Sequence, residues 1–118
     1  TLPRLVEALK ANWEGYEDIR QMCLKAPKFG NDEDYVDLIS RDVGRRVNDE
    51  TFSCKTNWGT GVNCDGTAAT AWWSFGRVCQ ATPDGRKSGD AYNDGSVSPM
   101  AGMDKKGPTA VLKSAGLF

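Results

Sequence analysis

The stretch from Asn31 to Val47 reads NDEDYVDLISRDVGRRV and carries the clearest structural pattern in the sequence. Asn31 is a preferred N-cap residue, and the acidic residues after it suit the positive end of a helix dipole. Apolar residues then recur at helical spacing and form one stripe. They are Tyr35, Leu38, Ile39, Val43 and Val47. The stretch therefore predicts an amphipathic helix that begins after Asn31.

The acidic residues of this stretch allow a second interpretation. Asp32, Asp34 and Asp37 could be metal ligands, because carboxylate oxygens bind hard cations. An acidic first turn explains the same residues without a cation. We favour the structural interpretation and expect no metal site here.

Two further helices are predicted on the N-terminal side. Leu2, Leu5, Val6 and Leu9 recur at helical spacing between Leu2 and Ala11. Tyr16, Ile19, Met22 and Cys23 do the same between Tyr16 and Ala26. Pro27 disfavours a helical conformation at Ala26 and so ends the second helix. Residues 1–50 are therefore expected to be helical.

The pattern changes after Asp49. Phe52, Cys54, Thr56 and Trp58 alternate with polar residues, which is typical of a half-buried strand. The run from Ala68 to Cys79 is mostly apolar and fits either a buried strand or a short helix. We favour a strand, because Gly76 and the aromatic residues disfavour a helix.

The last third is dominated by turn residues. From Gln80 to Gly107 the chain carries Pro-Asp-Gly, Asn-Asp-Gly and Ser-Pro sequences and few large apolar residues, so it predicts a long loop. Pro108 to Ala115 predicts a short helix that begins at a proline and is followed by Gly116. Strand and loop are thus expected over residues 51–118, within one domain that spans residues 1–118.

Charge and hydropathy exclude two classes of partner. Fifteen Lys and Arg residues against sixteen Asp and Glu residues leave a net charge of −1, so we expect no nucleic-acid binding. No apolar run is long enough to span a membrane, and the N-terminus lacks the pattern of a signal peptide. These features predict a cytoplasmic protein. The absence of an initiator Met suggests a piece of a larger chain.

The chain contains no histidine, which excludes Ser-His-Asp, Cys-His and HExxH chemistry within it. Its four cysteines are Cys23, Cys54, Cys64 and Cys79. None belongs to a CxxC pair, so a zinc or iron–sulfur site would have unusual spacing. Reduced and mostly buried thiols are the simpler expectation.

Two groups of motifs make the sequence recognisable. The first comprises LKANWEGYE at residues 9–17 and APKFGNDEDYVD at residues 26–37. The second comprises ATPDGRKSG at residues 81–89, DGSVSP at residues 94–99 and GPTAVLKS at residues 107–114. In this order and spacing, the motifs resemble those of the pyruvate formate-lyase-like glycyl radical enzymes. The resemblance covers most of the chain.

This resemblance implies an α/β fold, with the chain forming part of a ten-stranded α/β barrel. It implies a large cytosolic enzyme of anaerobic metabolism. In that family, a partner activase that uses S-adenosylmethionine and an iron–sulfur cluster installs a radical on a glycine. This glycyl radical generates a cysteine thiyl radical, which takes hydrogen from the substrate.

The resemblance also implies what the chain does not carry. None of the four cysteines has the sequence context of the thiyl cysteine, and no glycyl loop motif is present. The glycyl radical domain is therefore expected to be absent, and the segment is expected to bind no cofactor and to be inactive alone. Its expected partners are the rest of the catalytic subunit, the activase and a small-molecule substrate. The whole enzyme is expected to be a homo-oligomer or to carry small accessory subunits.

Three residues are candidates for substrate binding: Arg86, Ser98 and Pro99. Arg86 follows the Pro83-Asp84-Gly85 turn and can make paired hydrogen bonds to carbonyls or carboxylates. It could touch substrate or the glycyl loop, or it could brace its own loop. We favour bracing, because turn residues usually serve backbone geometry. Similarly, Trp72 and Trp73 could line a pocket, but packing is the simpler role.

Two short motifs are most similar to the alkylsuccinate and benzylsuccinate synthases. They are ANWEG at residues 11–15 and DGSVSPM at residues 94–100. These enzymes form a carbon–carbon bond by adding a hydrocarbon to fumarate. The alternatives within the family are a dehydratase, a choline lyase or a formate acetyltransferase-like enzyme. The alternative from another class is a small, non-catalytic binding module.

Overall fold

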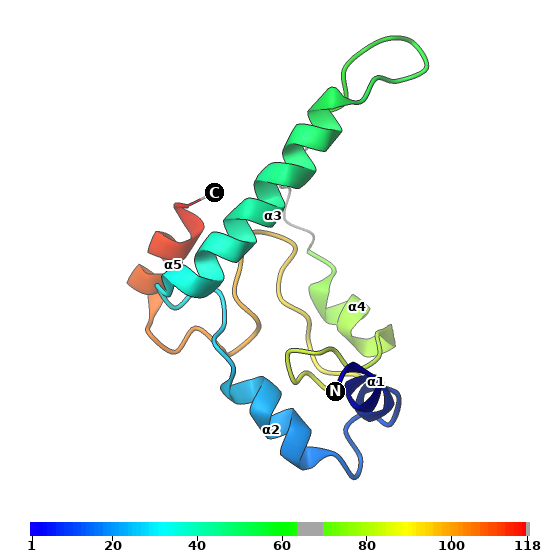
Figure 1. Cartoon of the computed structure of the whole chain (residues 1–118), viewed down its shortest axis with the longest axis vertical. Helices are drawn as coiled ribbons and strands as arrows, with labels where there is room; N and C mark the ends of the chain where they lie inside the picture. Colours follow the sequence, from blue (N-terminus) through cyan, green and yellow to red (C-terminus); the bar gives the residue numbers. More distant parts are fainter. Residues whose placement is uncertain (64–69, 118) are drawn as a thin grey trace. The chain divides into compact units, whose positions relative to one another are not determined.

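The computed structural model describes residues 1–63 and 70–117. Over these residues the chain forms five helices joined by turns and loops (Figure 1). They are α1 (Leu2–Lys10), α2 (Glu17–Lys25), α3 (Asp34–Ser53), α4 (Trp72–Val78) and α5 (Pro108–Ala115). The described residues contain no strand, only one isolated antiparallel bridge between Lys55 and Gly61. No described helix has both the length and the apolar character needed to cross a membrane.

The chain divides into two compact units, each built from two separate stretches of sequence. Unit 1 consists of Thr1–Pro27 and Ala69–Asp94, and unit 2 consists of Lys28–Ala68 and Gly95–Phe118. Each unit thus combines an early helical stretch with a late, loop-rich one.

Unit 1 has a small hydrophobic core around the indole of Trp13. Ala8 and Ala81 are buried with it, and partly buried apolar side chains from α1 and α2 pack against them. The helices predicted over Leu2–Ala11 and Tyr16–Ala26 are confirmed as α1 and α2. As predicted, Ala26 leaves the helical conformation, with ψ of 145° before Pro27.

Unit 2 buries polar groups at the place where α5 meets the start of α3. Asn31, Asp37 and Ser114 are buried there together with Ala110. The helix predicted after Asn31 is confirmed as α3, but its N-cap is Glu33 and not Asn31. Asn31 cannot cap the helix, because its side-chain amide donates to the carbonyls of Lys28 and Met103 and its oxygen accepts from the Lys106 N–H.

The apolar stripe of α3 has the predicted spacing but is exposed. Its five members, Tyr35, Leu38, Ile39, Val43 and Val47, have exposed fractions between 41% and 76%. The stripe makes α3 amphipathic, but no other described part of the chain covers it. Periodicity therefore predicted the helix correctly.

The strand predicted over Phe52–Trp58 is wrong. Helix α3 continues to Ser53, and the hydroxyls of Thr51 and Ser53 donate to carbonyls in its last turns. After Cys54 the chain turns back on itself, with the Thr56 N–H donating to the Thr60 carbonyl at 2.8 Å. An alternating pattern needs a neighbouring strand, and the described residues supply only the single bridge at Lys55.

The strand favoured over Ala68–Cys79 is also wrong where the structure describes it. Residues 68 and 69 lie outside the described residues, and Trp72–Val78 forms helix α4. Gly76 serves close packing: a Cβ at this position would lie 2.3 Å from the carbonyl oxygen of Asp90. Residues 80–107 contain turns but no helix or strand, as predicted, and α5 has the predicted bounds with a proline in its first turn.

Candidate functional site

Within the late loop, the turn at Pro83-Asp84-Gly85 in unit 1 is held by several hydrogen bonds. The Gly85 N–H donates to the Thr82 carbonyl, and the Thr82 N–H donates to the Arg86 carbonyl. One carboxylate oxygen of Asp84 accepts from the Thr82 hydroxyl and from the Arg86 N–H. Such Asp-backbone bonds stabilise a sharp reversal, as the sequence predicted.

Gly85 is required at this turn for two reasons. Its φ of 102° lies in the left-handed region, and a Cβ there would lie 2.6 Å from Cδ2 of Leu24 on α2. The turn therefore packs directly against α2.

The side chain of Arg86 is the centre of the site. Only 4% of the residue is exposed. Its Nη1 donates to the carbonyls of Gly76 (3.3 Å) and Asp90 (2.7 Å). Its Nη2 donates to the carbonyls of Cys79 (3.4 Å) and Gln80 (2.5 Å).

Two further contacts complete the surroundings of the guanidinium. Its Nε donates to the Thr82 hydroxyl at 3.2 Å, and the Tyr92 ring lies 4.4 Å from the guanidinium carbon. Carbonyl dipoles and the aromatic face thus offset the cost of burying the positive charge. All five N–H donors of Arg86 have acceptors within unit 1, an arrangement that only the fork geometry of arginine can make.

This geometry matches the bracing role for Arg86. The guanidinium joins the end of α4, the segment after it and the loop at Asp90, so that one side chain fixes residues 76–92. None of its donors is left over for a substrate. A direct contact between Arg86 and substrate stays a prediction.

The other two candidates, Ser98 and Pro99, belong to unit 2 and are half-buried. The Ser98 N–H donates to the Ser96 carbonyl, and the two serine hydroxyls lie 2.6 Å apart. Pro99 covers Gly30, where a Cβ would lie 2.7 Å from the Pro99 Cβ. Both residues therefore shape the loop within their own unit, and their contact with substrate stays a prediction.

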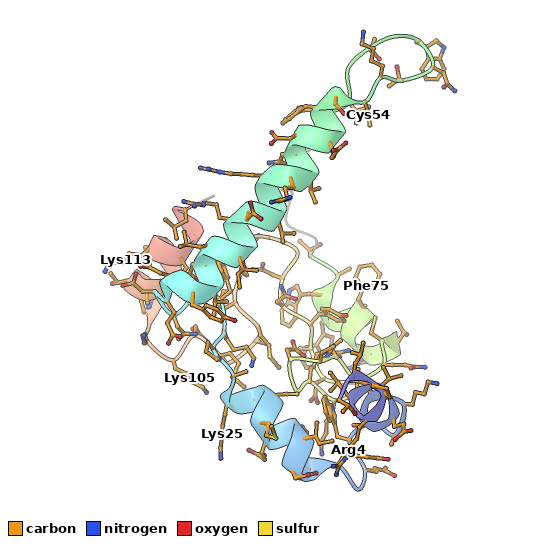
Figure 2. The ribbon with its side chains drawn as sticks, in the orientation of Figure 1. Arg4, Lys25, Cys54, Phe75, Lys105 and Lys113 are labelled. Carbon is orange, nitrogen blue, oxygen red and sulfur yellow. The ribbon has the colours of Figure 1, made fainter. Side chains whose placement is uncertain are left out.

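Among residues 1–63 and 70–117, the remaining chemistry-bearing side chains do not form a catalytic group. Cys54 is exposed at the end of α3 (Figure 2), which contradicts the expectation of mostly buried thiols, while Cys23 and Cys79 are half-buried. Cys64 lies outside the described residues. A cavity of about 660 Å³ between α1 and α2, lined by Leu5, Ile19 and Met22 among others, contains none of the three candidate residues.

Sequence reasoning missed a buried polar cluster in unit 2. One carboxylate oxygen of Asp37, Oδ2, accepts from the Ser114 hydroxyl (2.7 Å) and from the Glu33 N–H (3.1 Å). The Ser114 hydroxyl in turn accepts from the Asp32 N–H. Lys113, which Figure 2 labels on α5, pairs with the Asp32 carboxylate at 2.8 Å. Two of the three carboxylates considered as metal ligands, Asp32 and Asp37, thus have separate protein partners, and no metal-binding group occurs among the described residues. Nothing in the helical spacing distinguished Asp37 from its exposed neighbours.

Comparison with known proteins identifies the family. Residues 1–76 match the family described as pyruvate formate lyase-like. The chain is 43% identical over 116 residues to isethionate sulfite-lyase of Bilophila wadsworthia, which covers 97% of this chain and 14% of that protein. It is 39% identical over 111 residues to trans-4-hydroxy-L-proline dehydratase of Clostridioides difficile, which covers 93% of this chain and 14% of that protein.

Solved structures agree with the sequence matches. The crystal structure of hydroxyproline dehydratase from Clostridioides difficile superposes with a TM-score of 0.86 at 35% identity, over 98% of this chain and 15% of that one. The B12-independent glycerol dehydratase from Clostridium butyricum gives a TM-score of 0.83 at 36% identity, over 98% of this chain and 14% of that one. The chain belongs to the pyruvate formate lyase-like family of glycyl radical enzymes. It spans about one seventh of the length of these relatives.

These relatives correct the expected branch. They are a sulfite-lyase and dehydratases, and they give no support to the alkylsuccinate or benzylsuccinate synthases. They favour the dehydratase alternative. The motifs at residues 11–15 and 94–100 misled the choice because they are short, whereas the relatives match nearly the whole chain.

Proposed function

We propose that this chain is a structural segment of the catalytic subunit of a glycyl radical lyase that eliminates a group from a small polar substrate. The observation that carries the proposal is the identity of 39–43% over nearly the whole chain to a sulfite-lyase and a dehydratase. Both are named for elimination reactions. The segment's own part is to brace a loop, through the buried guanidinium of Arg86.

In this proposal the reactive groups lie on residues outside the 118 described by the sequence. A radical glycine and a thiyl cysteine elsewhere in the subunit take hydrogen from the substrate, and an activase that uses S-adenosylmethionine installs the radical. The enzyme works in the cytoplasm, alone as a homo-oligomer or with small subunits. A dense, water-excluding surround protects such a radical, and the fully hydrogen-bonded Arg86 loop suits that need.

The test uses the gene that encodes these residues. Its full-length product, activated without oxygen by its activase, should show a glycyl radical by electron paramagnetic resonance. It should then be offered isethionate, trans-4-hydroxyproline, glycerol, or toluene with fumarate. Turnover of one of the first three supports the proposal. Turnover only of toluene with fumarate would contradict the proposal and favour the synthase branch. The lack of any radical would contradict the assignment to the glycyl radical enzymes.

The chain of 118 residues provides the control. Under the same activation it should show neither a radical nor turnover. Circular dichroism of this chain also tests the alternative of a free-standing binding module, because such a module should melt cooperatively by itself.

A further inference from the structure

The corner between α1 and α2 holds two successive non-glycine residues with positive φ. Asn12 has a φ of 50° and Trp13 a φ of 70°. Asparagine tolerates this region, but a bulky tryptophan rarely adopts it. The corner is therefore in a conformation that costs free energy, and some other contact must offset that cost.

The end of α1 explains only part of this geometry. The Trp13 N–H donates to the Ala8 carbonyl at 2.8 Å, and the Asn12 N–H donates to the Leu9 carbonyl at 3.0 Å. This is the Schellman pattern of helix termination, in which a glycine most often takes the place of Asn12. A glycine would end the helix with less strain, so the asparagine side chain has a further role.

Both side chains of the corner hold the same distant loop. The Asn12 Oδ1 accepts from the Ser88 N–H at 2.8 Å. The buried Trp13 indole donates from Nε1 to the Arg86 carbonyl at 2.9 Å. From α2, Arg20 adds a third bond, from its Nε to the Gly85 carbonyl at 2.9 Å.

All three bonds end on backbone atoms of residues 85–88. They therefore fix the backbone course of this loop without using its side chains. Lys87 and Ser88 are exposed, so no hydrophobic burial orders them. A loop that is already ordered loses less conformational entropy when it meets a ligand or another surface.

We propose that the Asn12–Trp13 corner is a positioning device, which holds the Gly85–Ser88 loop in one conformation before that loop makes any contact elsewhere. The strain of the corner and the order of the loop are coupled through the bonds to Ser88 and Arg86. The inference stands on unit 1 alone and does not depend on the proposed function.

Amide hydrogen exchange of the full-length protein that contains these residues, read on the peptide that carries Ser88, tests this coupling at the Ser88 N–H. Asn12→Gly suits the backbone conformation but removes the acceptor, and it should speed Ser88 exchange about tenfold, the effect of losing one net hydrogen bond. Asn12→Asp keeps an acceptor and should restore slow exchange. Trp13→Phe keeps a ring but loses the donor, and it should also speed exchange at Ser88.

Lys25→Ala is the matched control, because the Lys25 side chain is exposed in the last turn of α2 and takes no part in the three bonds to the loop. It should leave Ser88 exchange unchanged. Fast exchange of Ser88 in the unmodified full-length protein would overturn the proposal. So would an Asn12→Gly effect of equal size throughout α2, or a failure of Asn12→Asp to restore protection.

Discussion

Unit 1 is organised around one long, charged side chain, whereas unit 2 is organised around several short polar ones. In unit 1, Arg86 alone reaches four backbone carbonyls and a hydroxyl. In unit 2, the buried bonds are shared among Asn31, Asp37 and Ser114, each of which makes two or three. A single hub concentrates stability in one position, and a shared network spreads it over several.

The two units resemble each other in one respect. Both bury few large apolar side chains and leave many exposed, including the stripe of α3 and the aromatic residues of α4. Hydrogen bonds made by buried polar side chains, rather than a large apolar core, therefore link the two stretches of sequence within each described unit. Substitutions of the buried polar residues should show how far the units differ.

The largest effect is expected for Arg86→Leu. The change leaves four carbonyls and the Thr82 hydroxyl without their donor, so the free energy of local opening of residues 76–92 should fall by about 3 kcal/mol or more. Amide hydrogen exchange measures it. Arg86→Lys should recover only part of the loss, because an ammonium cannot reproduce the five-donor fork.

Arg77→Leu is the control for Arg86, because Arg77 is exposed and its guanidinium only lies over the Trp73 ring at 5.7 Å. Its effect should stay below about 1 kcal/mol. If both substitutions lowered the free energy of local opening equally, the stability of unit 1 would not be concentrated at Arg86.

A smaller loss is expected in unit 2 for Asp37→Ala. The change removes the acceptor of the Ser114 hydroxyl and the Glu33 N–H, at a cost of about 2 kcal/mol in the opening of α5 from α3. Ser114→Ala should cost about 1 kcal/mol, because Asp37 keeps its bond to Glu33. Asp34→Ala, at an exposed position of the same turn, serves as the control and should cost less than about 1 kcal/mol, the loss of one helix-dipole interaction.

The next largest effect is the difference in lost stability between two substitutions in unit 2, Gly30→Ala and Gly59→Ala. Both glycines have positive φ, at 91° and 77°, so both substitutions strain the backbone by about 1 kcal/mol. Only at Gly30 does the added Cβ also collide with Pro99, whereas nothing lies within 4 Å at Gly59. Thermal or urea unfolding should therefore show the greater loss for Gly30→Ala, and equal losses would mean that Pro99 moves aside freely.

The smallest effect concerns the exposed carboxylate of Glu17 in unit 1. The hydrogen bond from Gln21, and then the contacts with Arg20, hold the pKa of this carboxyl below its ordinary value. A carboxyl with a lowered pKa stabilises the folded state at neutral pH, and this contribution is lost as the pH falls through the folded-state pKa. Gln21→Ala should therefore raise the Glu17 pKa, as an NMR titration would show, and an unchanged pKa would assign the shift to Arg20 and Lys87.

Local sequence patterns predicted the helices well because their information is local. The stripes of α1, α2 and α3 and the proline at the start of α5 act within one helix, and these elements are confirmed. The N-cap of α3 was wrong because the Asn31 side chain has partners more than seventy residues away. No local pattern carries that information.

The two strands failed for a related reason. A period of two in Phe52–Trp58 describes a surface that fits a sheet, but the described residues offer no sheet to join. In α4, Gly76 was taken as a helix breaker, although its lack of a side chain is what lets the Asp90 backbone approach.

The site was predictable only in outline. The Pro-Asp-Gly turn and the ability of Arg86 to bind carbonyls followed from residue chemistry, but the four particular carbonyls depend on how residues 76–90 fold back. Asp37 was hidden among exposed acidic residues, because its burial depends on Ser114, seventy-seven positions later.

The bonds of Arg86 also say which neighbours are free to change through evolution. Because the guanidinium grips main-chain oxygens at positions 79, 80 and 90, any amino acid that keeps the local chain path would serve there equally well. In related sequences, we therefore expect the arginine at position 86 to be invariant and the residues at positions 79, 80 and 90 to vary. The side chains on the surface of the loop can then change during evolution while the backbone conformation stays the same.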